Sequence, residues 1–141
     1  DIGYTHGFNF DISNPGSMNL VDQFYSETVP IAKQYKNLFG YSLANEPLFR
    51  DPVSALTSKN FHTSLEKRYG SIDMLNKRYG SSFGNFSDVP PSPKVQENKA
   101  QWLDWALYNQ DRVTNWFSFA CNSIKKYDSN AKCTIKVINK G

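Results

Sequence analysis

The pattern of apolar and polar residues divides this chain into helical stretches and two short strands. Apolar residues recur at helical spacing in residues 18–35 and 95–127, which predicts two amphipathic helices. Two shorter helices are predicted at residues 60–69 and 72–79, before repeated stop signals. Two short runs, residues 38–43 and 134–138, are mostly apolar or β-branched and have the length of buried strands. The intervening segments are rich in Gly, Pro, Ser and Asn, which favours loops.

Glycine and proline indicate where the predicted helices end or bend. The two middle helices close with the same string, Lys-Arg-Tyr-Gly-Ser, at residues 67–71 and 77–81. A Gly just past a helix, with basic residues in the last turn, is a C-terminal stop signal. Pro30 lies inside the first helix and is expected to kink it or to mark a boundary.

The order of the elements predicts a parallel pair of strands. A long helical crossover joins the two strands, which implies parallel strands and a right-handed connection. Two parallel strands do not form a stable sheet alone, so further strands are needed. The chain also opens at Asp1 without a Met or a leader segment and stops at Gly141, directly after a strand-like run. We therefore expect residues 1–141 to be an excerpt of a longer chain.

Composition and charge narrow the classes of function. The 16 Lys and Arg exceed the 13 Asp and Glu by three and form no long block, so nucleic acid is not an expected partner. No apolar run approaches the ~18 residues of a membrane-spanning helix, so no membrane partner is expected. With 15% aromatic residues, the chain is too aromatic for a disordered protein.

The chain has two cysteines, Cys121 and Cys133. Two cysteines do not make a disulfide framework, and without His neighbours they do not make a zinc site. We expect two small buried apolar residues, because free cysteines are commonly buried. A single bridge between a helix and the following strand is the alternative.

Glu46 is the best candidate for a catalytic residue. It follows a predicted buried strand in the corner Asn45-Glu46-Pro47, where Pro47 cannot extend the strand. Catalytic residues of α/β barrels lie at the carboxyl ends of strands. Apolar and aromatic neighbours raise the pKa of a carboxyl group, which suits a general acid at neutral pH. The amide of Asn45 can donate to and accept from a sugar hydroxyl.

Three blocks of the sequence, in order, resemble glycoside hydrolases of clan A. The string LFGYSLANEP is similar to the fourth barrel strand and acid/base corner of that clan. The string FHTSLEKRYGSIDMLNKRYGSSFGNFSDVPPS resembles the insertion after that corner in family 42 β-galactosidases and family 50 agarases. The string WLDWALYNQDRVTNWFSFACNSIKKYDSNAKCTIKV resembles the following barrel helix and fifth strand. The resemblance covers about residues 38–138.

The resemblance implies an α/β fold that is a fragment of a (β/α)₈ TIM barrel, about strands 3/4 to 5 with a long helical insertion. It implies a retaining glycosidase acting on a β-galactoside or related β-glycan, with Glu46 as general acid/base and no cofactor or metal. The attacking carboxylate lies on the seventh strand in clan A and is expected outside this chain. The 141 residues alone are therefore expected to be inactive, with a carbohydrate and the remainder of the barrel as partners. A non-catalytic carbohydrate-binding or interaction protein is the alternative.

Other residues are weaker candidates for contacts with a sugar. His6 lies before the first helix, Phe49 follows the acid/base corner, and Asn139 follows the second strand at the same end as Glu46. Three tryptophans on the apolar stripe of the long helix are expected in a core: Trp102, Trp105 and Trp116. His62 is expected on a helix surface.

Overall fold

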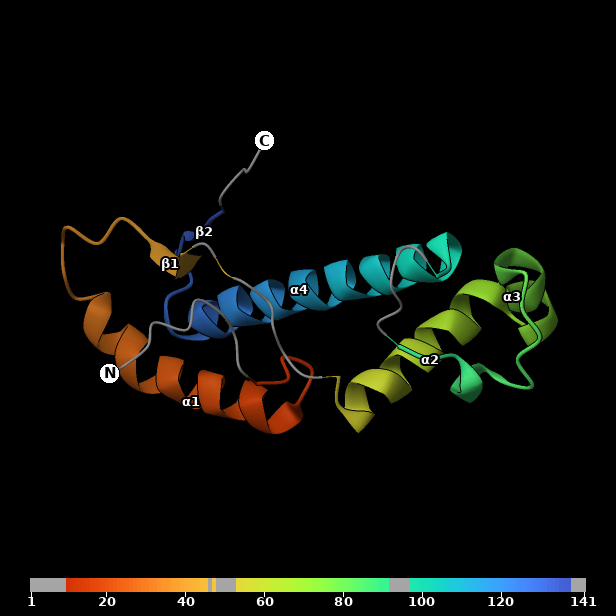
Figure 1. Ribbon diagram of the computed structural model, residues 1–141. Helices are drawn as coiled ribbons and strands as arrows, with labels where there is room; N and C mark the ends of the chain where they lie inside the picture. Colours follow the sequence, from red (N-terminus) through yellow and green to blue (C-terminus); the bar gives the residue numbers. More distant parts are fainter. Residues whose placement is uncertain (1–9, 46, 48–52, 92–96, 138–141) are drawn as a thin grey trace, which may run out of the picture. The chain divides into compact units, whose positions relative to one another are not determined.

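The computed structural model describes residues 10–45, 47, 53–91 and 97–137 (Figure 1). Its elements follow the chain in the order α1 (Pro15–Ala32), β1 (Tyr41–Asn45), α2 (Ala55–Tyr69), α3 (Ile72–Tyr79), the 3₁₀ turn η1 (Phe86–Asp88), α4 (Lys99–Tyr127) and β2 (Cys133–Lys136). They form two compact units. The helical unit is Val53–Arg112, and the sheet unit contains α1, β1, β2 and α4 from Val113 onward. Within these described residues, no helix is both long and apolar enough to cross a membrane.

Local capping explains where the helices begin and end. The side chain of Ser54 accepts a hydrogen bond from the Thr57 amide at 3.0 Å, so α2 begins five residues before the predicted start. Gly70 and Gly80 follow α2 and α3 with φ of 72° and 67°, a backbone conformation that favours glycine. The predicted stops after the repeated string are thus confirmed. Pro30 lies inside α1, which continues to Ala32, so a helix boundary at this proline is wrong.

The helical unit closes its own core. Six buried side chains from α2, α3, the residue after η1 and the first half of α4 form one cluster: Phe61, Leu65, Leu75, Tyr79, Val89 and Tyr108. Phe61 is fully buried and its ring lies 5.0 Å from that of Trp105 and 5.4 Å from that of Tyr108, measured between centroids. Aromatic pairs at such distances add to the free energy of burial.

A buried carboxylate joins three helices of the helical unit. Asp104 on α4 is 5% exposed and accepts hydrogen bonds from Arg68 Nη1 at 2.7 Å, Tyr69 Oη at 2.5 Å and Tyr79 Oη at 2.9 Å. Burial and then the Asp104 carboxylate raise the pKa of Tyr69 to about 12, and they raise the pKa of Tyr79 further. The buried charge is thus compensated by three donors.

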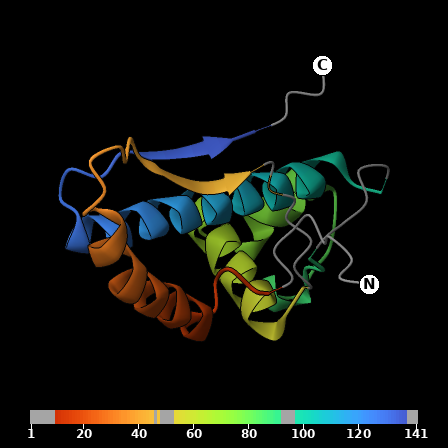
Figure 2. The same cartoon turned by 90° about the vertical axis from the view of Figure 1, so that its left-hand side faces the viewer.

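The sheet unit contains two adjacent parallel strands, as predicted. β1 and β2 pair in parallel, and α1 and α4 lie on the same side of this pair (Figure 2). Both strands differ in their bounds from the predicted residues 38–43 and 134–138. β1 begins at Tyr41, whose amide donates to the Lys132 carbonyl at 2.8 Å.

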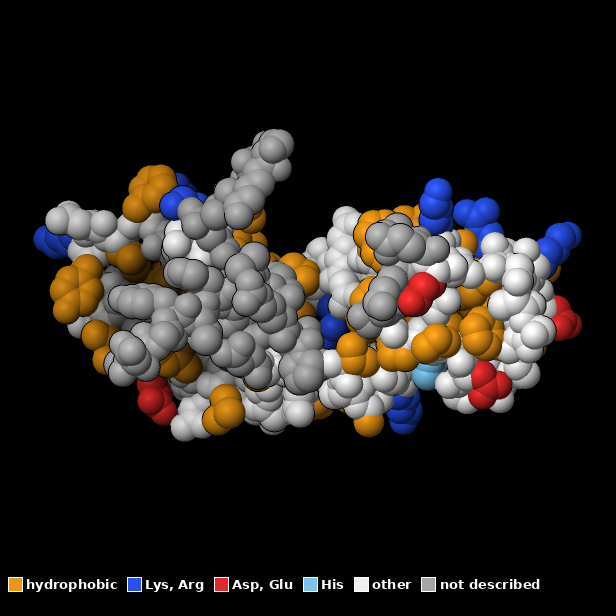
Figure 3. Space-filling view, viewed as in Figure 1, with side chains coloured by type: hydrophobic (Ala, Val, Ile, Leu, Met, Phe, Trp, Pro, Cys, Tyr) orange, Lys and Arg blue, Asp and Glu red, His pale blue; other side chains and the backbone are white. Residues whose placement is uncertain are grey.

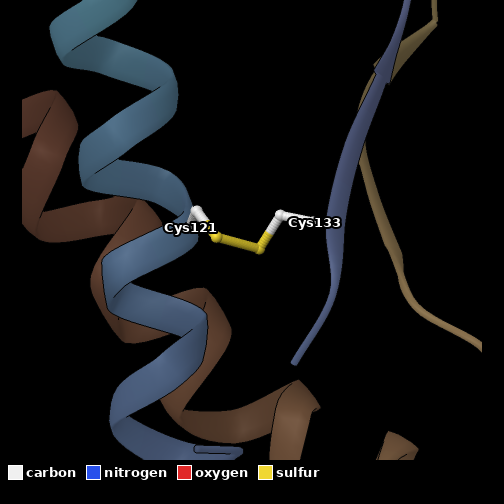
Figure 4. Close-up of a disulfide and its surroundings, with 2 residues drawn as sticks. All are labelled: Cys121 and Cys133. Atoms are coloured by element: carbon white, nitrogen blue, oxygen red, sulfur yellow. A yellow bond between two sulfur atoms is a disulfide. The ribbon is translucent and has the colours of Figure 1, made fainter. Parts of the chain in front are cut away.

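The expectation of two free, buried cysteines is wrong. Cys121 on α4 and Cys133 on β2 form a disulfide, with a Cα–Cα distance of 5.9 Å (Figure 4). Both residues are half-buried rather than core residues. The chain returns along α4 after a short turn, which brings the two Cα atoms within the range of a disulfide. The structure therefore has the bridge between helix and following strand that the sequence left as the alternative.

Candidate functional site

The carboxyl ends of β1 and β2 meet at one edge of the sheet. In the parallel register, Asn45 at the end of β1 is the partner of Lys136 at the end of β2. Both side chains are exposed. This edge, called the carboxyl edge below, is where α/β folds bind ligands.

Asn45 is the one predicted site residue that the structure describes. Glu46, Phe49, His6 and Asn139 lie outside the described residues, so their roles stay predictions. Asn45 lies at the carboxyl edge. This agrees with the prediction that the strand ends at the Asn45-Glu46-Pro47 corner.

A bulge in β1 decides which way Asn45 faces. The register shifts between Ser42 and Ala44, so Leu43 is an extra residue in β1. Strand side chains alternate between faces, so in a regular strand without a bulge Ser42 and Asn45, three residues apart, would face opposite ways. Both are exposed, as are their partners in β2, whereas Ala44 and its partner Ile135 are half-buried. Bulges near active sites commonly re-aim a side chain in this manner.

No pattern in the sequence indicated this bulge. A strand pattern alone would put Leu43 and Asn45 on one face of the sheet. The exposed face that results from the bulge is polar instead, and its side chains are Ser42, Asn45, Thr134 and Lys136. Amide, hydroxyl and ammonium groups can bind the hydroxyls of a sugar.

An apolar cavity lies on the other side of the strands, within the sheet unit. Its volume is about 630 Å³, and its lining includes Leu43, Ile135 and Val137 from the strands and Val113 and Phe117 from α4. The disulfide forms part of the wall. This cavity holds no titratable group in its lining, so we assign no chemistry to it.

The expected positions of the tryptophans and of His62 are confirmed only in part. Trp116 is buried and Trp105 packs against the core of the helical unit, as expected, but Trp102 is 41% exposed and the core prediction is wrong for it. His62 is half-buried, and its Nε2 lies 2.9 Å from the Val89 carbonyl oxygen. In the part of the chain that the structure describes, no group of three or more His, Cys, Asp or Glu side chains could hold a metal ion.

Helix-linked parallel strands with polar side chains at their carboxyl edge define an α/β protein. The profile of the glycoside hydrolase family 42, described as β-galactosidase, matches residues 12–140. The chain belongs to this family.

Relatives with known names agree with this assignment. The β-galactosidase Bga of Halorubrum lacusprofundi is 32% identical over 75 residues, which are 48% of this chain and 11% of that protein. The crystal structure of an exo-carrageenase of family 42 from Bacteroides ovatus is 34% identical, with a TM-score of 0.76 over 91% of this chain and 19% of that chain. A β-galactosidase from Bacillus circulans sp. alkalophilus has a TM-score of 0.77 at 14% identity, over 91% of this chain and 21% of its own, which is a likeness of fold alone.

The fold extends to agarases. The structure of the agarase AgWH50C has a TM-score of 0.72 at 19% identity, over 92% of this chain and 22% of its own. This likeness concerns the fold alone, and it confirms the second resemblance that the sequence indicated. The chain spans less than a quarter of the length of each of these relatives. Its mixed α/β structure, with two parallel strands, matches part of the TIM-barrel structures of family 42.

Proposed function

We propose that these residues are part of the catalytic barrel of a retaining glycoside hydrolase, with Glu46 as general acid and base. The observation that carries the proposal is the parallel register of β1 and β2, which brings Asn45 and Lys136 to one edge of the sheet in a family 42 chain. Glu46 directly follows Asn45 in the sequence. In α/β barrels the carboxyl ends of the strands hold the catalytic groups.

In this proposal β1 and β2 are the fourth and fifth strands of a barrel, and α2 and α3 are an insertion between them. The high structural similarity to family 42 enzymes over a fifth of their length supports this part of the proposal. The other strands, and the second carboxylate, belong to chain beyond these residues.

The reaction runs in two steps. The Glu46 carboxylic acid gives its proton to the glycosidic oxygen while a second carboxylate, about 5–5.5 Å away, attacks the anomeric carbon. The bond to the leaving group breaks and a glycosyl-enzyme ester forms. The Glu46 carboxylate then takes a proton from water, which attacks the same carbon and releases the sugar with its original configuration. Asn45 binds a sugar hydroxyl beside the reacting carbon.

The substrate is a β-galactoside or a related β-glycan. The names of the relatives support a galactose-based substrate, because they are β-galactosidases and an exo-carrageenase. The 34% identity with the exo-carrageenase extends the proposed class to sulfated galactans.

Replacement of Glu46 by Gln in the complete protein tests the proposal. Glutamine cannot donate the proton, so hydrolysis of an unactivated β-galactoside is expected to fall by about 10³-fold. An aryl galactoside with a very good leaving group needs no proton for the first step and should still form the glycosyl-enzyme. Added azide should then replace water and give a β-galactosyl azide. Glu66→Gln, at an exposed glutamate of α2, is the matched control and should keep full activity.

An unactivated substrate hydrolysed by Glu46→Gln within tenfold of the wild-type rate would refute the acid/base role. Inversion of the anomeric configuration in the first product, followed by NMR, would refute the retaining mechanism. Binding of the sugar without any hydrolysis by the wild type would favour a carbohydrate-binding protein instead.

A further inference from the structure

A second pocket in the sheet unit lies at the amino-terminal ends of β1 and β2, the end opposite to the carboxyl edge. Its volume is about 290 Å³. Two loops line it, the one that leads from α1 into β1 and the one that leads from α4 into β2. Its lining contains six charged or aromatic side chains: Lys33, Tyr35, Phe39, Tyr41, Asp128 and Lys132. We call it the basal pocket.

The base of the basal pocket is fixed by short contacts between its two loops. The Tyr41 amide donates to the Lys132 carbonyl at 2.8 Å, and the Tyr41 hydroxyl donates to Asp128 Oδ2 at 3.1 Å. A Cβ on Gly40 would lie 2.7 Å from the Lys132 carbonyl oxygen, so only glycine permits this approach. Lys33 Nζ donates to the Tyr127 carbonyl at 2.7 Å. The pocket is therefore formed by the fold before any ligand arrives.

Two aromatic side chains on this fixed base face water. Phe39 is 86% exposed and Tyr35 is 68% exposed. Lys132 Nζ lies 5.0 Å from the centroid of the Phe39 ring, a cation–π contact that orients this ring. Exposed hydrophobic side chains lie beside basic side chains over the sheet unit in the space-filling view (Figure 3). In the described part of the sheet unit Phe39 is mostly exposed, and its flat apolar ring is a surface on which a sugar ring can stack.

The charges around the basal pocket favour an anion. Its two loops carry Lys33, Lys36 and Lys132 against one carboxylate, Asp128. The Asp128 oxygens already accept hydrogen bonds from the Tyr41 hydroxyl and the Asn130 amide. The net charge of the two loops is therefore positive. The side-chain amide of Asn130, which also lines the pocket, offers both a donor and an acceptor.

We propose that the basal pocket binds a sulfated sugar residue of a polysaccharide, as a second site away from the carboxyl edge. The apolar face of a sugar ring would stack on Phe39, a sulfate ester would pair with Lys132 and Lys33, and a hydroxyl would bind Asn130. The choice of a sugar rests on the proposed function, whereas the anionic substituent follows from the lysines. Such a site would hold the polymer while hydrolysis takes place at the carboxyl edge.

The test measures how many oligosaccharides bind to each chain. The complete protein carrying Glu46→Gln, which blocks turnover, is titrated in a calorimeter with a sulfated galactan oligosaccharide and with its desulfated counterpart. We expect two sulfated oligosaccharides per chain, and one desulfated oligosaccharide. Phe39→Ala should weaken the second site about fivefold, because it removes the stacked apolar surface. Lys132→Gln should weaken it about threefold, and added NaCl should weaken it in the parent protein.

Matched variants are Trp102→Ala and Lys59→Gln, which remove an exposed aromatic and an exposed lysine from the helical unit. Both should leave two sites. A single binding site that is unchanged by Phe39→Ala overturns the proposal, as does equal occupancy of the second site by the desulfated sugar. Loss of self-association in Phe39→Ala, measured by sedimentation, would also overturn it, because the surface would then bind a second copy of the chain.

The assay separates this proposal from the proposed function. Hydrolysis of a small β-galactoside by the wild type, together with one binding site insensitive to Phe39, would leave the catalytic proposal intact and reject the basal pocket. Absence of hydrolysis by the wild type, together with a binding site that weakens in Phe39→Ala and Lys132→Gln, would reject the catalytic proposal and support the basal pocket.

Discussion

The helical unit and the sheet unit bury their apolar side chains to very different degrees. In the helical unit six side chains close a core, and of its described large apolar residues only Met74 is more than half exposed. The described part of the sheet unit exposes more than half of six such residues: Leu20, Phe24, Ile31, Tyr35, Phe39 and Val137. Short helices joined by tight turns can bury their apolar faces against one another, but two parallel strands cannot cover both of their edges.

The difference shows which interactions hold each unit. Packing and a buried polar network stabilise the helical unit, and its residues lie close together in the sequence. A covalent bond between α4 and β2 supplements a smaller core in the sheet unit. The following changes should therefore affect one unit much more than the other, and residue-resolved hydrogen exchange distinguishes them.

The largest loss of stability is expected from Phe61→Ala. This side chain is fully buried between aromatic rings, so its removal leaves a cavity and should lower the free energy of unfolding by about 4 kcal/mol. Denaturant titration measures the change, and hydrogen exchange should rise in α2 and α3. Met74→Ala, at a 57% exposed position of α3, is the control and should cost about 0.5 kcal/mol or less. Equal effects of the two variants would mean that this core does not hold the helical unit.

Asp104→Ala should have the next largest effect. It leaves the hydroxyls of Tyr69 and Tyr79 without their buried acceptor and should cost about 3 kcal/mol. Asp111→Ala, at an exposed aspartate of the same helix, is the matched control and should be nearly neutral.

Alkaline titration gives a second measure of the Asp104 network. The folded-state pKa of Tyr69, about 12, is higher than its ordinary value of 10.0. The folded state therefore holds this proton more tightly than the unfolded state, and the corresponding stability is complete below pH 10 and is lost as the pH rises through about 12. Ultraviolet absorbance of tyrosinate should show Tyr69 ionising at lower pH in Asp104→Ala. An unchanged titration curve would contradict the role of this carboxylate.

A smaller loss, centred on the sheet unit, is expected when the disulfide is removed. The bridge closes a short loop, since Cys121 and Cys133 are 12 residues apart. Replacement of both by Ser should cost about 2 kcal/mol, with faster hydrogen exchange in β2 and little change in α3. Thiol titration of the unfolded, unreduced protein should find no free thiol from this pair. Two free thiols, or equal exchange in wild type and variant, would contradict this assignment.

The sequence predicted features that depend on neighbouring residues. The stops after α2 and α3 follow from a glycine with basic residues before it, and Gly70 and Gly80 have the expected backbone angles. The parallel pairing followed from the length of the crossover alone. The start of α2 was predicted too late, although Ser54, whose side chain caps the helix, is a residue type preferred at that position.

By itself the sequence determined the order of helices and strands, their parallel arrangement and the resemblance to family 42, because each depends on local periodicity or on an ordered set of residues. Only the tertiary structure decided that Leu43 is a bulge residue that turns Asn45 to the polar face, that the two cysteines are joined, and that Asp104 binds two tyrosines 25 and 35 residues away. These features depend on the register of one strand against another and on distances between remote residues. Such distances are fixed when the elements pack and leave no periodic trace in the sequence.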